Sequence, residues 1–340
     1  MAHPRCRAEP WTGRARPLID NRAPTPLSST HFGVRKRGPR VTVLTLFLLA
    51  AALLAGCTPR HPARASEDSL TEGRIRIVCP ADVAGLIQRE REAFEALYPK
   101  ARIEVVRGTS SEGIRQLFGA RADLAVCTRD LSPEERAAAT RGRLGVEGYG
   151  MARDAIVVVV HAASPVENLT VEDVRHIYDG HATRWSEYGG PAEEIVPVVQ
   201  TAGGDLTEAF VQQVMAGNPI TARSVYAASD SEVVAEVSRR PGSIGYVTLG
   251  WANRGVRALR ISSLMGLPYW KPDLEAVYQS EYPLTRAVTL LVRTPGHPLA
   301  DGFVTFACSR DGQQIVKETG LVPTTVPVRF VRRSPMQGDH

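Results

Sequence analysis

The chain has 340 residues and a net charge of +5, from 41 Lys and Arg against 36 Asp and Glu. Residues 1–57 hold nine of the basic and two of the acidic side chains, so residues 58–340 carry a net charge of −2. The basic excess therefore belongs to the N-terminal segment, and the rest of the chain has no charge excess that favours nucleic-acid binding. Roughly 270 residues remain for folded structure, enough for one large or two medium-sized domains.

The N-terminal segment has the pattern of a secretory leader. Residues 1–40 are rich in Pro and Arg without apolar periodicity, and we expect them to be an unstructured extension with a basic end. The uncharged apolar run 41–57 follows, and it is shorter than the ~20 residues that a membrane-spanning helix needs. A basic region, an apolar region and small residues before a cleavage point are typical of a signal peptide.

The end of this run, LAGC at residues 54–57, resembles the lipobox of bacterial lipoproteins. The resemblance implies that the thiol of Cys57 is lipidated and that Cys57 becomes the mature N-terminus. We therefore expect an extracytoplasmic protein that a lipid tethers to the cell membrane or to the outer membrane. A buried core helix is the alternative, which the polar, Pro-containing flanks on both sides disfavour.

A spacer and then an alternation of strands and helices follow in chain order. Residues 58–71 are polar and contain Pro, which is typical of a linker. Beyond them, the apolar pattern predicts strands at residues 74–78, 102–106 and 122–126, and helices at residues 83–98, 112–118 and 133–140. This alternation is typical of α/β proteins.

The middle of the chain contains the longest apolar run outside the leader, AIVVVV at residues 155–160. It is apolar on both faces, so we expect a strand that is buried between layers. Beyond it, strands are predicted at residues 195–199, 244–248 and 287–292, and helices at residues 171–178, 206–215, 231–239, 303–308 and 313–319. We expect residues 331–340 to be a disordered tail.

Small or polar residues mark three junctions at which a predicted strand ends and a helix begins. The junctions lie at residues 79–82, 108–111 and 203–205. Helix N-termini offer unpaired N–H groups and the positive end of the helix dipole, and in open parallel sheets such junctions meet at one edge. The pattern is compatible with an anion site and equally with ordinary capped helices.

The order of several longer segments resembles one family. The segments are ADLAVCTRDLSPEE from residue 122, MARDAIVVVVHAASPVENLTVEDVRHIYDGHATRWSEYGG from 151, RRPGSIGYV from 239, EYPLTRAV from 281 and SRDGQQIVKETGLVP from 309. Together they resemble the periplasmic phosphate-binding proteins of ABC transporters, from about residue 74 to residue 323. The resemblance implies a monomer that binds a small solute, phosphate in that family, and delivers it to a membrane permease.

The resemblance also implies the fold, an α/β periplasmic-binding-protein fold of type II with two lobes and the ligand between them. Residues 156–160 and 287–292 would be the two crossover strands. Lobe 1 would then consist of residues 72–157 and 284–330, and lobe 2 of residues 158–283.

Several ligand-binding positions of the family are kept or conservatively changed in this chain. Ser110, with Ser111 beside it, matches the serine of the second junction. Asp123 matches an aspartate that accepts a hydrogen bond from phosphate. Thr128 matches the serine before the family's arginine, which is Arg129 here.

Other positions depart from the family's pattern. The first junction contains Pro80, which has no N–H to donate, and Asp82 in place of a threonine. Gln200 replaces an arginine ahead of the third junction and cannot supply that residue's charged fork. Gly204 and Asp205 stand where the family has Ser and Gly.

These departures change the expected ligand. Asp205 and Glu208 form a D-x-x-E pattern that predicts a capping box, although Asp82 and Asp205 are equally explained as ordinary helix caps. One carboxylate 4 Å from a phosphate costs about 4 kcal/mol at an effective dielectric constant near 20. We expect Asp82, Asp123 and Asp205 to make the cleft acidic, so that it takes a neutral or cationic ligand or has lost its ligand.

Cys79 and Cys127 are predicted at the carboxyl ends of two strands that are neighbours in the family's sheet order. Adjacent strands lie ~4.8 Å apart, which is compatible with a disulfide. The alternatives are a disulfide, which an extracytoplasmic location permits, and two buried free thiols.

The chain contains no GxSxG, HExxH or CxxC motif, so neither an enzyme nor a metal or cofactor site is expected. The competing role from another class is an extracytoplasmic receptor or scaffold that binds a protein or no ligand.

Overall fold

A computed structural model describes residues 68–201 and 203–324. The predicted leader with Cys57, most of the spacer and the predicted tail lie outside the described residues. Among residues 68–324, no helix combines the length and the apolar character that crossing a membrane requires.

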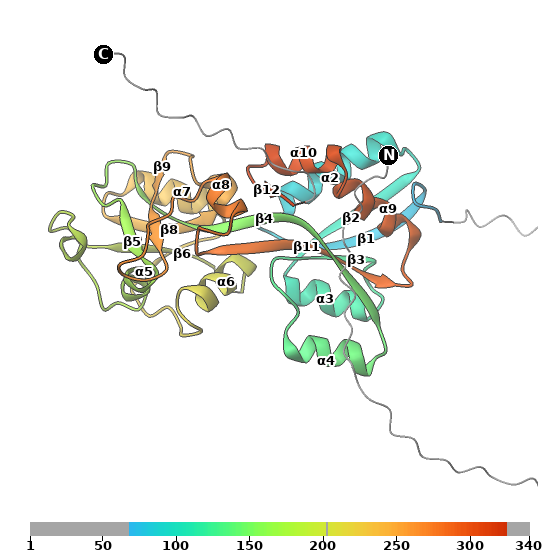
Figure 1. Ribbon diagram of the computed structural model, residues 1–340, viewed down its shortest axis with the longest axis horizontal. Helices are drawn as coiled ribbons and strands as arrows, with labels where there is room; N and C mark the ends of the chain where they lie inside the picture. The colour runs from blue at the N-terminus through green and yellow to red at the C-terminus, as the bar shows by residue number, and fades with distance from the viewer. Residues whose placement is uncertain (1–67, 202, 325–340) are drawn as a thin grey trace, which may run out of the picture. The chain divides into compact units, whose positions relative to one another are not determined.

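The described residues form a mixed sheet of ten strands, in the order β2-β1-β3-β11-β4-β8-β6-β7, with β9 and β12 also paired to β4 (Figure 1). A second, two-stranded sheet pairs β10 with β5. The strands are β1 (Gly73–Pro80), β2 (Ala101–Gly108), β3 (Leu124–Cys127), β4 (Gly145–His161), β5 (Asn168–Thr170), β6 (Val196–Gln200), β7 (Val225–Ala227), β8 (Ser243–Thr248), β9 (Val256–Ala258), β10 (Arg260–Ser262), β11 (Thr285–Thr294) and β12 (Val322–Pro323).

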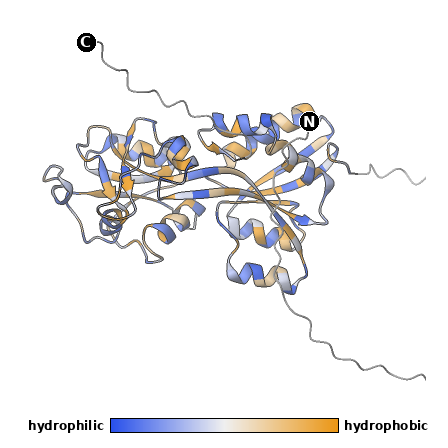
Figure 2. Cartoon of the chain, viewed as in Figure 1, coloured by the Kyte–Doolittle hydropathy of each residue, from blue (hydrophilic) through white to orange (hydrophobic). Residues whose placement is uncertain are grey.

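The described helices alternate with these strands, as the sequence predicts for an α/β protein. They are α2 (Ala84–Leu97), α3 (Ser110–Phe118), α4 (Pro133–Arg141), α5 (Val171–Tyr178), α6 (Asp205–Gln213), α7 (Asp230–Arg239), α8 (Leu274–Tyr278), α9 (Pro298–Ala307) and α10 (Arg310–Glu318), with short 3₁₀ turns η1 (Trp185–Tyr188) and η2 (Leu249–Trp251). Hydrophobic residues concentrate on the strands, whereas the helices carry both hydrophobic and hydrophilic faces (Figure 2).

We use the name lobe 1 for the part of the fold built from β1, β2, β3, α2, α3, α4, α9 and α10. Its strands β1, β2 and β3 are parallel. The helices α2, α9 and α10 lie on one side of this sheet and α3 and α4 on the other (Figure 1). Lobe 1 is discontinuous in sequence, because α9 and α10 follow β11.

Lobe 2 is the part built from β5 to β10 and α5 to α8. Two long antiparallel strands connect the lobes. β4 pairs with β11 along residues 145–155 and with β8 along residues 156–160. The described residues thus have the two-lobed fold with two crossover strands that the sequence predicts. The exact residues at which one lobe ends and the other begins stay a prediction.

The run 156–160 is completely buried in β4, as its apolar character on both faces predicts. However, β4 begins at Gly145, ten residues before the predicted start. This first part contains three glycines and several polar residues, so it lacks the pattern of a strand. A Cβ atom at Gly145 would collide with the carbonyl oxygen of Thr294, which explains why glycine stands where β4 meets β11.

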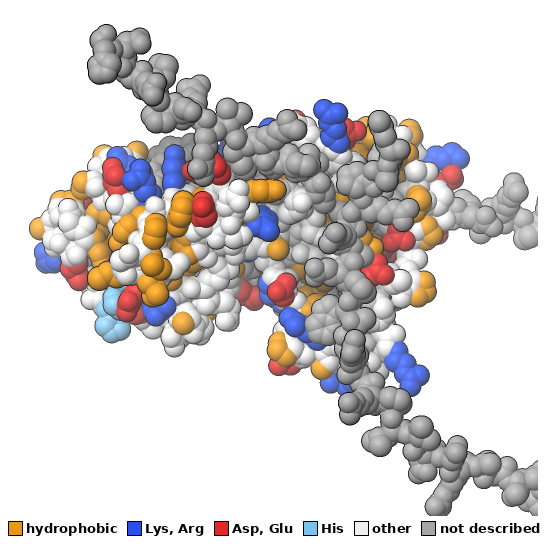
Figure 3. Space-filling view, in the orientation of Figure 1, with side chains coloured by type: hydrophobic (Ala, Val, Ile, Leu, Met, Phe, Trp, Pro, Cys, Tyr) orange, Lys and Arg blue, Asp and Glu red, His pale blue; other side chains and the backbone are white. Residues whose placement is uncertain are grey.

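The helix ends follow local sequence signals. Ser132 and Glu135 form a reciprocal capping box at α4, although this helix buries none of its side chains. α9 begins at Pro298, five residues before the predicted start, because Pro occupies the first turn and the His297 ring accepts a hydrogen bond from the Leu299 N–H. On the face seen in Figure 3, basic and acidic side chains are interspersed.

Candidate functional site

The carboxyl ends of the parallel strands β1 and β2 lead into the predicted junctions, and a cavity of about 950 Å³ opens beside them. Both lobes and a crossover strand line this cavity. Its lining includes Ser111, Thr128 and Arg129 from lobe 1, Asp205 and Glu208 from α6, and Arg286 from β11. The structure therefore gathers several of the predicted site residues around one cleft.

The lobe 1 face of the cleft presents the N-terminus of α3. Thr109 caps this helix, and its hydroxyl accepts a hydrogen bond from the Glu112 N–H. Ser110 is fully buried, and its hydroxyl accepts a hydrogen bond of 3.0 Å from the Thr128 N–H. Ser110 and Thr128 thus hold the second and third strand ends of lobe 1 together.

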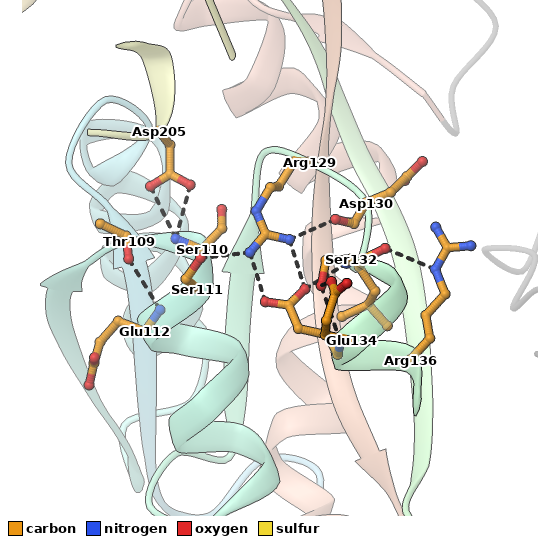
Figure 4. Close-up of polar contacts among 12 residues, drawn as sticks. Thr109, Ser110, Ser111, Glu112, Arg129, Asp130, Ser132, Glu134, Arg136 and Asp205 are labelled. Atoms are coloured by element: carbon orange, nitrogen blue, oxygen red, sulfur yellow. Dashed lines mark hydrogen bonds and ion pairs between the residues drawn. The ribbon is translucent and has the colours of Figure 1, made fainter. Parts of the chain in front are cut away.

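The Ser110 N–H points across the cleft and meets a carboxylate of the other lobe. Both oxygens of Asp205 lie 3.0 Å from this nitrogen, as the two dashed lines in Figure 4 show. The Asp205 residue is only 6% exposed. Burial raises the pKa of this carboxyl, the hydrogen bonds from Ser110 oppose that effect, and the nearby Asp82 carboxylate adds to it.

This geometry corrects the prediction of a capping box at α6. Gly204 is the N-cap of this helix, and no side chain caps it. Asp205 is instead the first residue of α6, and its carboxylate turns away to accept from α3. The D-x-x-E pattern was therefore misleading, because a donor of the other lobe competes for the same carboxylate.

Arg129 lies in the same cleft, but its guanidinium already has partners. It makes a two-pronged ion pair with Glu135, with both N···O distances 2.8 Å. It also donates to the hydroxyl of Ser111 at 2.7 Å, as Figure 4 shows. It also donates to the backbone carbonyl of Asp130. The hydrogen bonds that Arg129 donates to the Glu135 carboxylate raise the pKa of Arg129. This cation is thus bound to lobe 1 itself.

Asp82 neither caps α2 nor stands free in the cleft. Its carboxylate lies 2.6 Å from the guanidinium of Arg286, which also donates to Asp154 at 2.6 and 2.9 Å. The side chains are 8%, 2% and 0% exposed for Asp82, Arg286 and Asp154. Asp154 further accepts from the Leu249 N–H of lobe 2. Two carboxylates therefore share one buried cation where the lobes meet the crossover strands.

Gln200 is also engaged inside lobe 2. Its amide donates to Asp230 at 2.7 Å, and Asp230 accepts a second hydrogen bond from the Thr248 hydroxyl. Burial raises the pKa of Asp230 to about 6. Gln200 thus supports the start of α7 and is not among the residues that line the cavity.

The structure contradicts the placement of Asp123 in the cleft. Asp123 precedes β3 and accepts a hydrogen bond from the Arg76 N–H in the middle of β1. It therefore lies at the amino end of β3, ~16 Å along the strand from Thr128 at the carboxyl end. Of the three aspartates predicted to make the cleft acidic, Asp82, Asp123 and Asp205, only Asp205 lines the cavity.

The structure also contradicts a disulfide between Cys79 and Cys127, since both thiols are free and buried. Ile77 and Val78 of β1 pair with Leu124 and Ala125 of β3. Side chains alternate between faces, so this register sends the Cys79 side chain to one face of the sheet and that of Cys127 to the other. The second alternative, two buried free thiols, is the one observed.

Four residues that take part in these interactions were not predicted from the sequence: Glu135, Asp154, Asp230 and Arg286. A signal was present for two of them, because Asp154 and Arg286 are charges that directly precede apolar runs of the sequence. Their pairing in the β4–β11 register joins them. Among the described residues, no group of three His, Cys, Asp or Glu is arranged to hold a metal ion.

Comparisons of the sequence with known proteins show its family. Residues 64–311 match the family model of the PBP superfamily domain. The phosphate-binding protein PstS of Borreliella burgdorferi is 22% identical over 292 residues, which cover 82% of this chain and 97% of that protein. The phosphate-binding protein PstS of Bacillus subtilis is 24% identical over 298 residues, which cover 83% of this chain and 94% of that protein.

Solved structures show the same fold. An ABC-type phosphate transport receptor from Vibrio cholerae superposes with a TM-score of 0.64 at 22% identity, over 74% of this chain and all of that chain. PstS from Borrelia burgdorferi superposes with a TM-score of 0.56 at 22% identity, over 74% of this chain and 99% of that chain.

Proposed function

The chain belongs to the PBP superfamily, among its phosphate-binding proteins, and we propose that it is a solute-binding lipoprotein of an ABC transporter whose ligand is neutral or cationic. The family consists of transport receptors rather than enzymes. In this proposal Cys57 carries the lipid, the two lobes enclose the solute, and a membrane permease receives it.

The charge of the cavity carries this proposal. Four of the residues that line it are acidic, and two are arginines. Each arginine is already paired, Arg129 with Glu135 and Arg286 with Asp82 and Asp154. Neither cation is therefore available as an uncompensated partner for an anionic solute.

The acidic side chains of α6 strengthen the argument. Asp205 and Glu208 lie on the same helix and both line the cavity. Burial and the Asp205 carboxylate raise the pKa of Glu208, which indicates that the two negative charges influence each other. A unit anion 4 Å from one such carboxylate loses about 4 kcal/mol at an effective dielectric constant of 20, and a cation gains as much.

The test is a binding screen on the full-length protein purified in detergent. Calorimetry with inorganic phosphate should give no heat of binding at micromolar concentrations. A thermal-shift panel of organic ammonium ions, amino acids, sugars and divalent cations should contain a neutral or cationic solute that raises Tm, because a ligand of the native state stabilises it. Micromolar phosphate binding would contradict the proposal.

Glu208→Gln is the matched variant for a cationic ligand. Glu208 is exposed on α6, so its replacement should leave the fold intact. Because Glu208 is exposed and its charge is screened by solvent, its removal should weaken the binding of a monovalent cation by only about tenfold, or about 1.4 kcal/mol. The binding of a neutral solute should stay unchanged. The variant therefore separates the two ligand classes.

A receptor or scaffold that binds a protein or no solute is the second candidate. The hydrogen bonds between Asp205 and Ser110 favour it, because they join the lobes through groups of the protein alone. If no solute in the panel raises Tm, and no permease and ATPase genes lie beside the gene, this candidate replaces the first.

A further inference from the structure

We propose that Asp205 determines which ligands the cleft accepts, because its carboxylate occupies the position at the N-terminus of α3 that an oxyanion would need. The inference rests on the proposed function in one respect, that the cavity between the lobes is the ligand site. In this inference Asp205 is the residue that excludes oxyanions from the cleft.

The first observation is the contact itself. Asp205 accepts the Ser110 N–H with both oxygens at 3.0 Å, and Ser110 is the first residue of α3. The N–H groups of a first helical turn have no partner within the helix, and they attract anions together with the helix dipole. A side-chain carboxylate in this position makes the same interaction as a bound carboxylate, sulfate or phosphate.

The second observation is that Asp205 gives up its local role to make this contact. It begins α6, and no side chain caps that helix. An aspartate at the start of a helix ordinarily stabilises the N–H groups or the dipole of its own helix. Its orientation toward the other lobe, drawn in Figure 4, indicates that the donor on α3 decides where the carboxylate lies.

The third observation is the surroundings of the carboxylate. Asp205 lines the cavity together with Ser111, Thr128 and Arg286. The positive charge of Arg286 lowers the pKa of Asp205, against the raising effect of burial. A backbone N–H thus donates to this carboxylate, and two hydroxyl side chains and a guanidinium line the same cavity. Such a set of groups suits an anion.

Asp205 consequently competes with any external oxyanion for the same donor. An incoming oxyanion must displace a carboxylate that is covalently part of the protein and must also approach its negative charge. A neutral or cationic solute meets no such competition, because it uses the rest of the cavity.

The experiment replaces Asp205 in the full-length protein and measures phosphate and sulfate binding by calorimetry. Asp205→Ser removes the charge and frees the Ser110 N–H, and we expect its phosphate affinity to rise at least tenfold above that of the wild type. Asp205→Asn keeps the size of the side chain. Its phosphate affinity should rise less, because the amide oxygen still accepts the hydrogen bond from the Ser110 N–H.

Glu208→Gln is the matched control, since it removes one negative charge from the same cavity without a bond to α3. An equal gain in this control would overturn the inference, because charge alone would then explain the effect. No gain in Asp205→Ser or Asp205→Asn, with both variants folded by circular dichroism, would overturn it as well. If Asp205→Ser fails to fold, the comparison of phosphate affinity between Asp205→Asn and Glu208→Gln decides the question.

The outcomes for the two proposals are distinguishable. Micromolar phosphate binding by the wild type contradicts the proposed ligand class and, with it, the exclusion of oxyanions by Asp205. Failure of the Asp205 variants to gain phosphate binding contradicts only the role of Asp205.

Discussion

The two faces of the cleft differ in what they present to a ligand. The lobe 1 face carries the N–H of Ser110 at the start of α3 and the guanidinium of Arg129, which is paired with the lobe 1 carboxylate of Glu135. The lobe 2 face carries acceptors, the carboxylates of Asp205 and Glu208 on α6. Both contain the start of a helix, and yet the start of α3 presents a donor whereas the start of α6 presents acceptors.

This difference teaches that a helix N-terminus becomes an anion site only when no carboxylate of the same protein reaches it. The donor on α3 is satisfied by Asp205, and the cation beside it, Arg129, is satisfied by Glu135. The phosphate-binding donors of the family that this chain retains are therefore already paired with carboxylates of the protein itself. Three variants test how far this pairing of donors with carboxylates governs the two faces.

Arg286→Met should have the largest effect, because Arg286 is the cation to which both Asp82 and Asp154 are bound. Its removal leaves two buried carboxylates without a counter-charge, and breaking a buried pair in this way costs about 3–5 kcal/mol. Arg129→Met is the control, since Arg129 is partly exposed and its pair with Glu135 should contribute only about 1 kcal/mol. Denaturant unfolding measures both, and equal losses would refute the distinction.

Glu90 on α2 sharpens the comparison, because it is a buried carboxylate that meets no donor among the described residues. Burial raises its pKa to about 9 in the folded protein, from an ordinary value of 4.5. A raised folded pKa favours the protonated form, so its contribution to stability is complete below pH 4.5 and is lost as the pH rises toward 9.

Glu90→Gln should therefore gain stability relative to the wild type as the pH rises. Between pH 4.5 and pH 7 the gain should reach about 3 kcal/mol, because each pH unit corresponds to ~1.36 kcal/mol. Urea unfolding at several pH values measures the effect. Glu92→Gln, an exposed residue of the same helix, is the control, and parallel pH profiles for both variants would contradict the prediction.

Thr109→Ala should have the smallest effect, because it removes only the cap of α3 on the lobe 1 face. Loss of such a cap typically costs about 1 kcal/mol in the free energy of unfolding. Thr305→Ala, at an exposed position inside α9, is the control and should change it by less than about 0.5 kcal/mol. A thermal melt of the two variants distinguishes these values.

Much of the fold was predictable, because its signals are local. The alternation of apolar runs located most strands and helices to within a few residues, and α5 is found at the predicted residues. The start of β4 was missed because its partner β11, more than a hundred residues away, supplies the pairing that its glycines and polar residues do not suggest.

The site was predictable only in part. Ser110, Thr128 and Asp205 meet at the cleft as expected, whereas Asp123 does not, since it lies at the opposite end of its strand. Matching a residue to a family position does not reveal the strand end at which it lies. That depends on which residue of β3 pairs with which residue of β1.

The sequence by itself determined the order of strands and helices, the junctions between them and the family, because apolar periodicity and chain order are properties of neighbouring residues. Only the tertiary structure decided the partners of the charged side chains. Asp205 meets Ser110 across 95 residues of sequence, and Arg286 meets Asp154 across 132. The physical reason is that a buried carboxylate takes the nearest donor in space, and the packing of the two lobes and the register of the strands determine which donor that is.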